Sequence, residues 1–307
     1  MAACIVPLYI YPKILSMKIG IVQQSNCKDG ELNLNNSLTQ ISNLAGQGAE
    51  LIILQELHRT IYFCQSESQH NFQLAESLDG PTSAALAQAA RDNHVVVVGS
   101  IFEKRNNGVY HNTAVVLDSD GSMAGFYRKM HIPDDPGYYE KYYFTPGDTG
   151  FKPIPCSLGK LGLLICWDQW FPEASRLMAL AGAEILIFPT AIGWDPDDTQ
   201  EEKERQLDAW LTIQRSHSIA NNLPLVCVNR VGHEADHSEH TRGINFWGNS
   251  FVCDAMGKVI FRCGSTNEEQ HIVEIDINET VQQRILWPYF RDRRIDAYSD
   301  LTKRSID

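Results

Sequence analysis

The sequence predicts an α/β protein in which two stacked sheets are each covered by helices, giving a four-layer α-β-β-α sandwich. The first observation is that short apolar, β-branched runs alternate with segments of helical period along the 307 residues. The second is an internal echo: residues 48–54 resemble residues 182–188, and each stretch follows an amphipathic helical pattern. Two pseudo-repeated halves, each with a sheet covered on one face, would bury their free faces against each other.

Each predicted element follows from its local period and its bounding residues. The predicted strands cover residues 18–23, 50–54, 95–102, 112–118, 122–128, 161–166, 184–188, 225–230, 249–253, 258–262 and 271–276. The predicted helices cover residues 33–47, 82–93, 172–181 and 201–221. The hairpin near residues 118–121 recurs near residues 254–257, which supports the repeat.

We expect a single domain over residues 17–307, because no Gly/Ser-rich linker interrupts it. Its last part, from about residue 280, is expected to form a C-terminal arm. Residues 1–16 are interpreted as an extension rather than a signal peptide, because they lack a basic start and contain Pro7 and Pro12.

Composition narrows the possible partners. The net charge of -12 argues against nucleic acid, which requires a basic face, and no apolar run reaches the length of a membrane helix. The eight cysteines contain no CxxC pair and no regular spacing. We therefore expect a reduced, cytoplasmic protein without a disulfide framework or a zinc finger.

Three reactive residues each follow an apolar strand: Glu56, Lys129 and Cys166. Ligands bind at the carboxyl ends of strands in open α/β sheets, so these side chains are candidates for one site. Cys166 also precedes a helix start near residues 171–173, a position expected to expose its sulfur and lower the pKa of its thiol. A base, a cation and a nucleophile together are what thiol-based amide chemistry requires.

With these residues, the sequence from Met17 onward resembles the nitrilase (carbon-nitrogen hydrolase) superfamily. Glu56 in QEL, Lys129 in YRKMHIP and Cys166 in CWDQWFPE match its Glu-Lys-Cys set, and Glu140 in EKYYFTPG matches a second glutamate. The resemblance implies that Glu56 is the general base and Cys166 the nucleophile. Lys129 and the N–H of Trp167 would stabilise the oxyanion, and Glu140 would position Lys129. It also implies a dimer or higher homo-oligomer, with neither cofactor nor metal.

The residues after the cysteine bear on the substrate. N-carbamoyl-D-amino-acid hydrolases carry arginines there for a carboxylate, whereas this chain has Gln169 and Trp170. Carboxylates and aromatic rings suit an ammonium group, although each of Asp195, Asp197 and Asp198 could equally belong to a solvated loop. The predicted substrate contacts are Trp167, Gln169, Trp170, Trp194, Asp195 and Tyr139.

The CWDQWFPE stretch and the tail 287–294, followed by Asp296 and Tyr298, look most like N-carbamoylputrescine amidases. That resemblance implies cleavage of a ureido C–N bond to give putrescine, carbon dioxide and ammonia, a step of polyamine synthesis. The alternatives are a β-ureidopropionase (β-alanine synthase), acting on N-carbamoyl-β-alanine, and another ω-amide hydrolase. The tail is a candidate oligomer contact.

A different class of enzyme is suggested by residues 233–237, which spell HExxH. In zinc hydrolases this motif lies on a helix, so that both histidines share one face. Here it lies in a polar, glycine-bounded stretch without apolar period, which favours a histidine-rich loop over a zinc site. A binding protein that retains the fold without turnover is a further alternative, which the intact Glu-Lys-Cys set disfavours.

Overall fold

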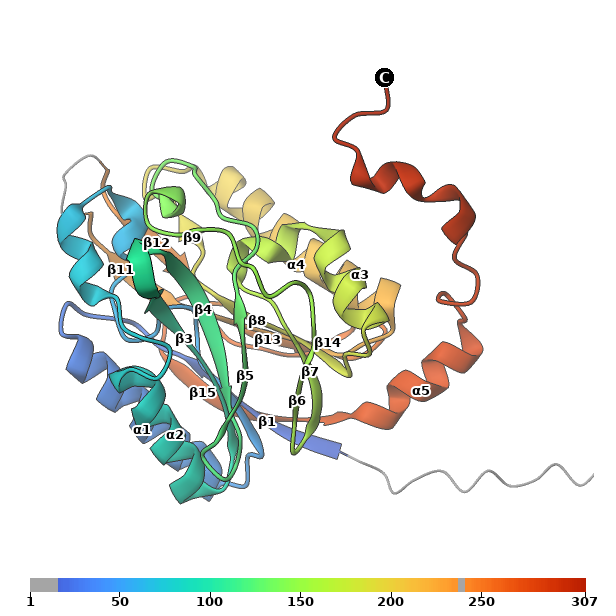
Figure 1. Cartoon of the computed structure of the whole chain (residues 1–307), viewed down its shortest axis with the longest axis horizontal. Helices are drawn as coiled ribbons and strands as arrows, with labels where there is room; N and C mark the ends of the chain where they lie inside the picture. Colours follow the sequence, from blue (N-terminus) through green and yellow to red (C-terminus); the bar gives the residue numbers. More distant parts are fainter. Residues whose placement is uncertain (1–15, 237–240) are drawn as a thin grey trace, which may run out of the picture.

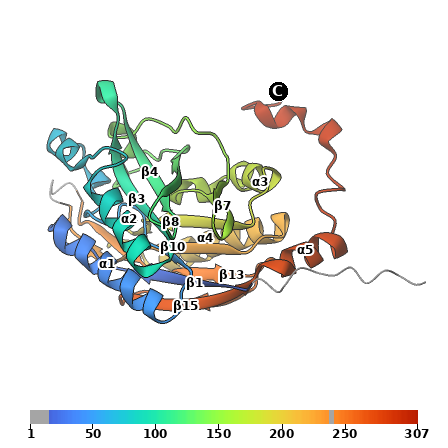
Figure 2. The same cartoon turned by 60° about the horizontal axis from the view of Figure 1, so that its bottom comes forward.

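Two six-stranded mixed sheets lie face to face in the computed structural model, which describes residues 16–236 and 241–307 (Figure 1). The first sheet has the order β15-β1-β2-β3-β4-β5 and the second the order β14-β13-β10-β8-β7-β6. Helices α1 and α2 cover the outer face of the first sheet, and α3 and α4 that of the second (Figure 2). The predicted four-layer sandwich is confirmed.

The strands of the first sheet are β1 (Ser16–Gln23), β2 (Leu51–Ile53), β3 (Val96–Lys104), β4 (Tyr110–Leu117), β5 (Met123–Arg128) and β15 (Glu269–Asp276). Those of the second are β6 (Ile154–Cys156), β7 (Gly159–Leu163), β8 (Ile185–Thr190), β10 (Leu225–Asn229), β13 (Phe251–Cys253) and β14 (Val259–Arg262). The helices are α1 (Gly30–Gly46), α2 (Pro81–Asn93), α3 (Pro172–Leu180), α4 (Gln200–Asn221) and α5 (Ile277–Leu286).

The strand pairings show the internal repeat. Strands β1, β2 and β3 are parallel neighbours and continue into the antiparallel strands β4 and β5. Strands β7, β8 and β10 are likewise parallel and continue into β13 and β14. Each half therefore places the carboxyl ends of three parallel strands at one edge, where a site can form.

Side-chain alternation along the strands builds the layers. Ile19 and Ile21 of β1 belong to the core between the sheets, whereas Val22 packs in the core beneath α1 and α2. On β2, Ile53 belongs to the first core and Ile52 to the second. The strands are apolar on both faces because both faces are buried, which explains why their sequences read as continuous apolar runs.

Local signals fix the helix ends. The Asp29 side chain accepts hydrogen bonds from the N–H groups of Glu31 and Leu32, which caps the start of α1. Pro81 occupies the first turn of α2, where its missing N–H costs nothing. Helix α4 is followed by its C-cap residue Asn222, which adopts a left-handed conformation with φ of 45°.

A small third sheet was not predicted. It consists of β9 (Gly193–Trp194), β11 (Val231–Glu234) and β12 (Ile244–Trp247), in the order β11-β12-β9. These strands are too short and too rich in polar and glycine residues to show an alternating pattern. The predicted strand 161–166 also ends earlier, at Leu163.

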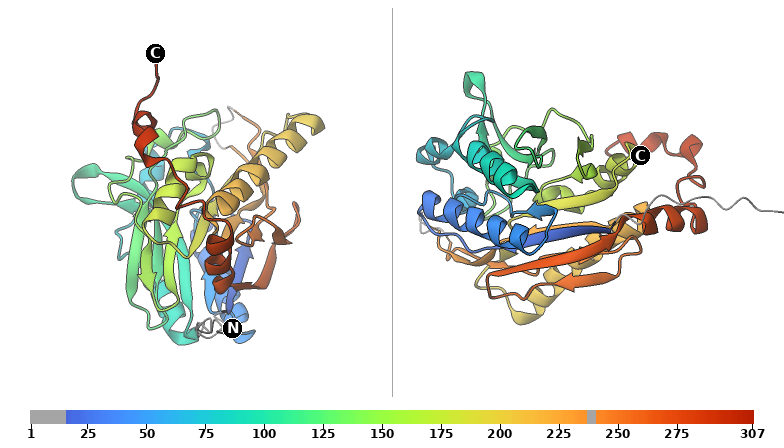
Figure 3. Two further views of the ribbon diagram at one scale, coloured as in Figure 1. Left: turned by 90° about the vertical axis from the view of Figure 1, so that its right-hand side faces the viewer. Right: turned by 90° about the horizontal axis from the view of Figure 1, so that it is seen from below.

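After β15, which pairs antiparallel with β1, the chain leaves the sandwich through α5 and an extended tail (Figure 3). The tail is anchored by Phe290, whose ring lies 4.9 Å from the guanidinium carbons of both Arg176 and Arg284. Within the described ranges, no helix is long and apolar enough to cross a membrane. The seven cysteines described are free, and the cytoplasmic location stays a prediction.

Candidate active site

A buried lysine between two carboxylates forms the centre of the site. Lys129 follows β5, and its Nζ lies 2.8 Å from Glu56 Oε1 and 2.7 Å from Glu140 Oε2. All three side chains are fully buried. Burial opposes the charge of Lys129, but the two carboxylates hold the pKa of its ammonium well above the usual value. Burial also raises the pKa of Glu140, to about 7, against the opposing effect of Lys129.

Neighbouring polar groups orient the two carboxylates. Asn112 Nδ2 donates to Glu56 Oε1 at 2.6 Å, and the Tyr62 hydroxyl donates to Glu140 Oε1 at 2.7 Å. The second oxygen of Glu56, Oε2, is buried and has no hydrogen-bond partner among the described residues. An unsatisfied buried carboxylate oxygen is costly, so its retention marks a position that can accept a proton from a thiol or a water.

Cys166 opens the 3-10 helix η5 (Cys166–Trp170) with a φ of 41°, a strained conformation for a residue other than glycine. The turn is held by Asp168, whose Oδ2 accepts from the Ile165 N–H at 2.9 Å and from the Tyr127 hydroxyl at 2.9 Å. The Asp168 N–H in turn donates to the Ile165 carbonyl at 3.0 Å. These bonds fix the direction of the cysteine side chain.

The predicted lowering of the Cys166 pKa is wrong. The thiol is buried, with the residue only 5% exposed, and burial raises its pKa well above the usual value. The negative charges of Glu56 and Glu140 act in the same direction, and Lys129 acts against them. The sequence places a helix start after the cysteine but cannot show how deeply the sulfur is buried. A thiol in this state requires a base to become a nucleophile.

A cavity of about 480 Å³ adjoins Cys166. Three of the predicted substrate contacts, Trp167, Trp170 and Asp195, line it together with Asp198. The remaining lining residues are Pro133, Asp135, Pro136, Tyr138, Ile192, Gly193, Arg205, Gln206, Ala209 and Trp247. The wall thus combines aromatic rings with three carboxylates.

The other three predicted contacts, Tyr139, Gln169 and Trp194, are not among the described residues of that wall. Gln169 is fully buried, and its carbonyl accepts from His217 Nε2 at 2.8 Å. The indole N–H of Trp194 donates to the Lys203 carbonyl, and its ring packs against Trp247. Trp247 lines the cavity instead of Trp194. Tyr138, the residue before Tyr139, lines the cavity instead.

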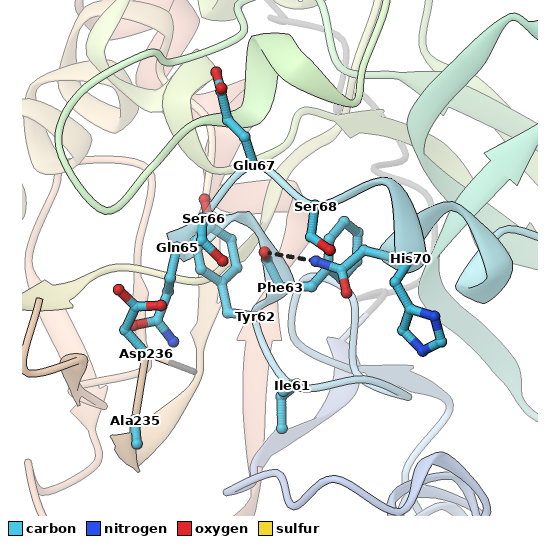
Figure 4. Close-up of a pocket in the computed structure, with 11 residues that line it drawn as sticks. Ile61, Tyr62, Phe63, Gln65, Ser66, Glu67, Ser68, His70, Ala235 and Asp236 are labelled. Atoms are coloured by element: carbon cyan, nitrogen blue, oxygen red, sulfur yellow. Dashed lines mark hydrogen bonds between the residues drawn. The ribbon is translucent and has the colours of Figure 1, made fainter. Parts of the chain in front are cut away.

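A second cavity, of about 430 Å³, lies beside Tyr62 (Figure 4). It is lined by residues 61–63, 65–68, 70, 71, 235 and 236. None of Glu56, Lys129, Glu140 and Cys166 belongs to its described wall. The first cavity is therefore the one that can present a substrate to the thiol.

Arg230, which the sequence analysis did not single out, ties the two halves together at the site. Its guanidinium donates to the carbonyls of Glu56 at 3.0 Å and Leu57 at 2.9 Å, and pairs with Glu234 at 2.6 Å. Leu57 has a φ of 49°, so the Arg230 guanidinium holds a strained turn after β2.

The sequence also did not predict the roles of Asn112, Tyr62 and Asp168. The polar residues that precede the apolar run 114–117 in the predicted strand 112–118 were the available signal for Asn112.

The HExxH stretch does not form a helix in its described part. His233 and Glu234 are neighbours on β11, where successive side chains point to opposite faces. His233 is exposed, whereas Glu234 is buried and accepts from the Tyr62 N–H at 2.5 Å. His237 lies outside the described residues. The geometry of the zinc-hydrolase motif is therefore not present at the residues described.

Comparisons with known proteins agree with this geometry. The model of the carbon-nitrogen hydrolase family matches residues 18–285. The chain is 43% identical to a tomato (Solanum lycopersicum) N-carbamoylputrescine amidase, over 83% of this chain and 84% of the relative. It is 38% identical to a citrullinase of Francisella tularensis, over 94% and 99% respectively. The crystal structure of a carbon-nitrogen hydrolase from Helicobacter pylori superposes with a TM-score of 0.93 at 49% identity, covering 95% of this chain and 100% of that one. The chain belongs to the carbon-nitrogen hydrolase family, the nitrilase superfamily, and is a hydrolase acting on amides.

Proposed function

We propose that this protein hydrolyses N-carbamoylputrescine to putrescine, carbon dioxide and ammonia, a step of polyamine synthesis. The observation that carries the proposal is the wall of the cavity beside Cys166. Asp135, Asp195 and Asp198 contribute carboxylates to it, and tryptophan and tyrosine rings complete it. Such a lining suits the distal ammonium group of the substrate. The amidases of tomato and of Oryza sativa, 43% and 41% identical to this chain, support the same substrate.

The arrangement of the buried groups supports a covalent mechanism. Glu56 Oε2 takes the proton of the Cys166 thiol, and the thiolate attacks the ureido carbon. Lys129 uses two of its three N–H groups on Glu56 and Glu140, so one remains for the developing oxyanion. The N–H of Trp167, the residue after the nucleophile, is the second donor.

Collapse of the tetrahedral intermediate breaks the bond between the ureido carbon and the putrescine nitrogen. Glu56 gives its proton to that nitrogen, and putrescine leaves as the free amine. The covalent intermediate that remains is a carbamoyl group on the sulfur of Cys166. Glu56 then removes a proton from water, which attacks this carbonyl and releases the thiol. The product carbamate decomposes to carbon dioxide and ammonia.

Citrulline is the second candidate, because the Francisella relative is a citrullinase. Citrulline is N-carbamoylputrescine with a carboxylate on the carbon that bears the amine. The cation in the cavity wall that could bind this carboxylate is Arg205, whose guanidinium donates twice to Glu202, at 2.9 and 2.7 Å. With that charge already paired, the three carboxylates of the wall favour the substrate that lacks a carboxylate. The same argument disfavours N-carbamoyl-β-alanine.

Ammonia release from N-carbamoylputrescine, citrulline and N-carbamoyl-β-alanine tests the proposal. We expect the highest kcat/KM for the first substrate, and no turnover by a folded Cys166→Ala variant. Asp195→Asn should raise KM for N-carbamoylputrescine about tenfold, the effect of losing about 1.4 kcal/mol of binding. Arg205→Gln, the matched control, should leave that KM unchanged. A preference for citrulline that Arg205→Gln abolishes would overturn the substrate assignment but not the hydrolase.

We also propose that the protein is a homo-oligomer that assembles through α3, α5 and the tail. Leu177 and Leu180 on α3 are 44% and 46% exposed, and Leu286 and Trp287 are 69% and 52% exposed. Apolar side chains gathered on neighbouring elements mark an interface. Light scattering should give at least twice the mass of one chain, 34.6 kDa. An unchanged mass after removal of residues 287–307 would contradict a role for the tail.

A further inference from the structure

Three potential metal ligands meet where the edges of the two sheets adjoin. Cys263 directly follows β14, the edge strand of the second sheet, and Glu269 and His271 lie on β15, the edge strand of the first. The sulfur, one carboxylate oxygen and one imidazole nitrogen all lie within 4.8 Å of one another. In the order of the second sheet, β8, β10 and β13 separate β14 from β7, the strand that precedes Cys166. The cluster is therefore distinct from the active site.

The thiol of Cys263 is buried. The residue is 2% exposed, and within the described part of the chain its sulfur makes no hydrogen bond. Its backbone is fixed, because the Cys263 N–H donates to the Ser250 carbonyl at 2.8 Å. The next N–H, that of Gly264, donates to Glu269 Oε1 at 2.7 Å and brings the carboxylate to the sulfur.

The imidazole is also held in place. Glu269 and His271 are two residues apart on one strand, so both side chains point to the same face. His271 Nε2 lies 2.9 Å from Glu269 Oε2, and the ring packs against Phe261 of β14 at a centroid distance of 4.4 Å. The three donors thus already lie close together, which reduces the ordering that binding requires.

We propose that Cys263, Glu269 and His271 bind a zinc ion, or a divalent transition-metal ion of similar preference. Sulfur, nitrogen and oxygen donors together are the set that zinc takes in proteins, at about 2.0 to 2.3 Å from the ion. The side chains of Glu269 and His271 are 25% and 41% exposed, so small rotations can close them around an ion that enters from solvent. Water supplies the remaining ligand.

The site has a structural consequence. It joins β14, the edge strand of the second sheet, to β15, the edge strand of the first sheet, which pairs with β1. An ion bound there stabilises the folded chain by mass action, because the unfolded chain does not hold the three donors together. The proposal is independent of the proposed substrate.

Titration with cobalt(II) tests the site, because a thiolate ligand gives a sulfur-to-cobalt charge-transfer band in the near ultraviolet. The experiment uses the full chain carrying Cys166→Ala, which removes the active-site thiol as a competing ligand. We expect one equivalent of cobalt to give the band, and zinc to displace it. Adding Cys263→Ser should abolish the band, and adding His271→Asn should weaken cobalt binding by at least about tenfold.

Cys156→Ser is the matched control, because Cys156 is a half-exposed cysteine on β6 at the opposite edge of the second sheet. It should leave the band and the affinity unchanged. If Cys263→Ser does not fold, the Glu269→Gln and His271→Asn variants, which change partly exposed residues, replace it. Each should then bind cobalt more weakly than the parent. The absence of a band in the parent, or a band that survives Cys263→Ser or is lost in Cys156→Ser, would overturn the proposal.

Discussion

Removal of the Tyr62 hydroxyl should move the pH dependence of catalysis. In Tyr62→Phe the Glu140 carboxylate loses its hydrogen bond of 2.7 Å inside a fully buried cluster. A hydrogen bond to a charged acceptor contributes about 1.5 to 3 kcal/mol, and one pKa unit corresponds to about 1.4 kcal/mol. Burial already raises the pKa of Glu140 to about 7. Loss of this hydrogen bond should raise that pKa by about one to two further units.

The sign of the effect follows from the role of Glu140. Below its pKa the carboxyl is neutral and holds Lys129 less firmly, so activity falls as the pH decreases through that value. The acid limb of the kcat/KM profile, measured as ammonia release from N-carbamoylputrescine, should therefore move to higher pH by at least about one unit. At a pH well above the new value, much of the activity should return.

Tyr143→Phe is the matched control. Its hydroxyl is also hydrogen-bonded within the neighbouring aromatic cluster, to the Ser66 carbonyl at 2.5 Å, but it does not contact Glu140. This variant should keep the wild-type acid limb. An active Tyr62→Phe enzyme whose acid limb stays where it is in the wild type would refute the assignment of that limb to Glu140.

Three further effects are expected. Asp168→Asn leaves buried donors around the cysteine turn without an acceptor, so the free energy of unfolding should fall by about 2 to 4 kcal/mol in urea titrations, with a lower kcat. Gly147→Ala would place a Cβ on the Arg128 carbonyl oxygen and should lower both the melting temperature and kcat, whereas Gly46→Ala, with open space, should not. Burial lowers the pKa of His58 from 6.5 to about 3, so the unfolded chain takes up its proton first as the pH falls. Between pH 7 and pH 5, the free energy of unfolding of the wild type should therefore fall by about 2 kcal/mol relative to that of His58→Gln, which lacks this group.

The fold was readable from the sequence because each half repeats one arrangement of strands that are buried on both faces. Continuous apolar runs predict such strands. The similarity between residues 48–54 and 182–188 indicates that the arrangement is duplicated. The small sheet of β9, β11 and β12 could not be predicted, since its strands have only two to four residues and show no alternating pattern. Their pairing is set by tertiary contacts rather than by local pattern.

At the site, the residues that end strands could be predicted, and the residues that orient them could not. Glu56, Lys129 and Cys166 follow apolar runs in a recognisable order. Asn112 and Arg230 act across distances of 56 and 174 residues along the chain, which no local pattern encodes. The substrate wall was predicted in part, because the sequence points to the loop of Asp195 but cannot determine which neighbouring ring faces the cavity.

Both halves of the chain contribute residues to one active site. Enzyme activity therefore reports whether the two sheets are packed correctly against each other. Glu56 and Lys129 come from the first half, whereas Cys166 and the Arg230 clamp come from the second. A slight separation of the sheets would part the base from the nucleophile before either sheet unravels. Activity should therefore disappear at a lower urea concentration than secondary structure does, and an enzyme assay would detect the first opening of the sandwich.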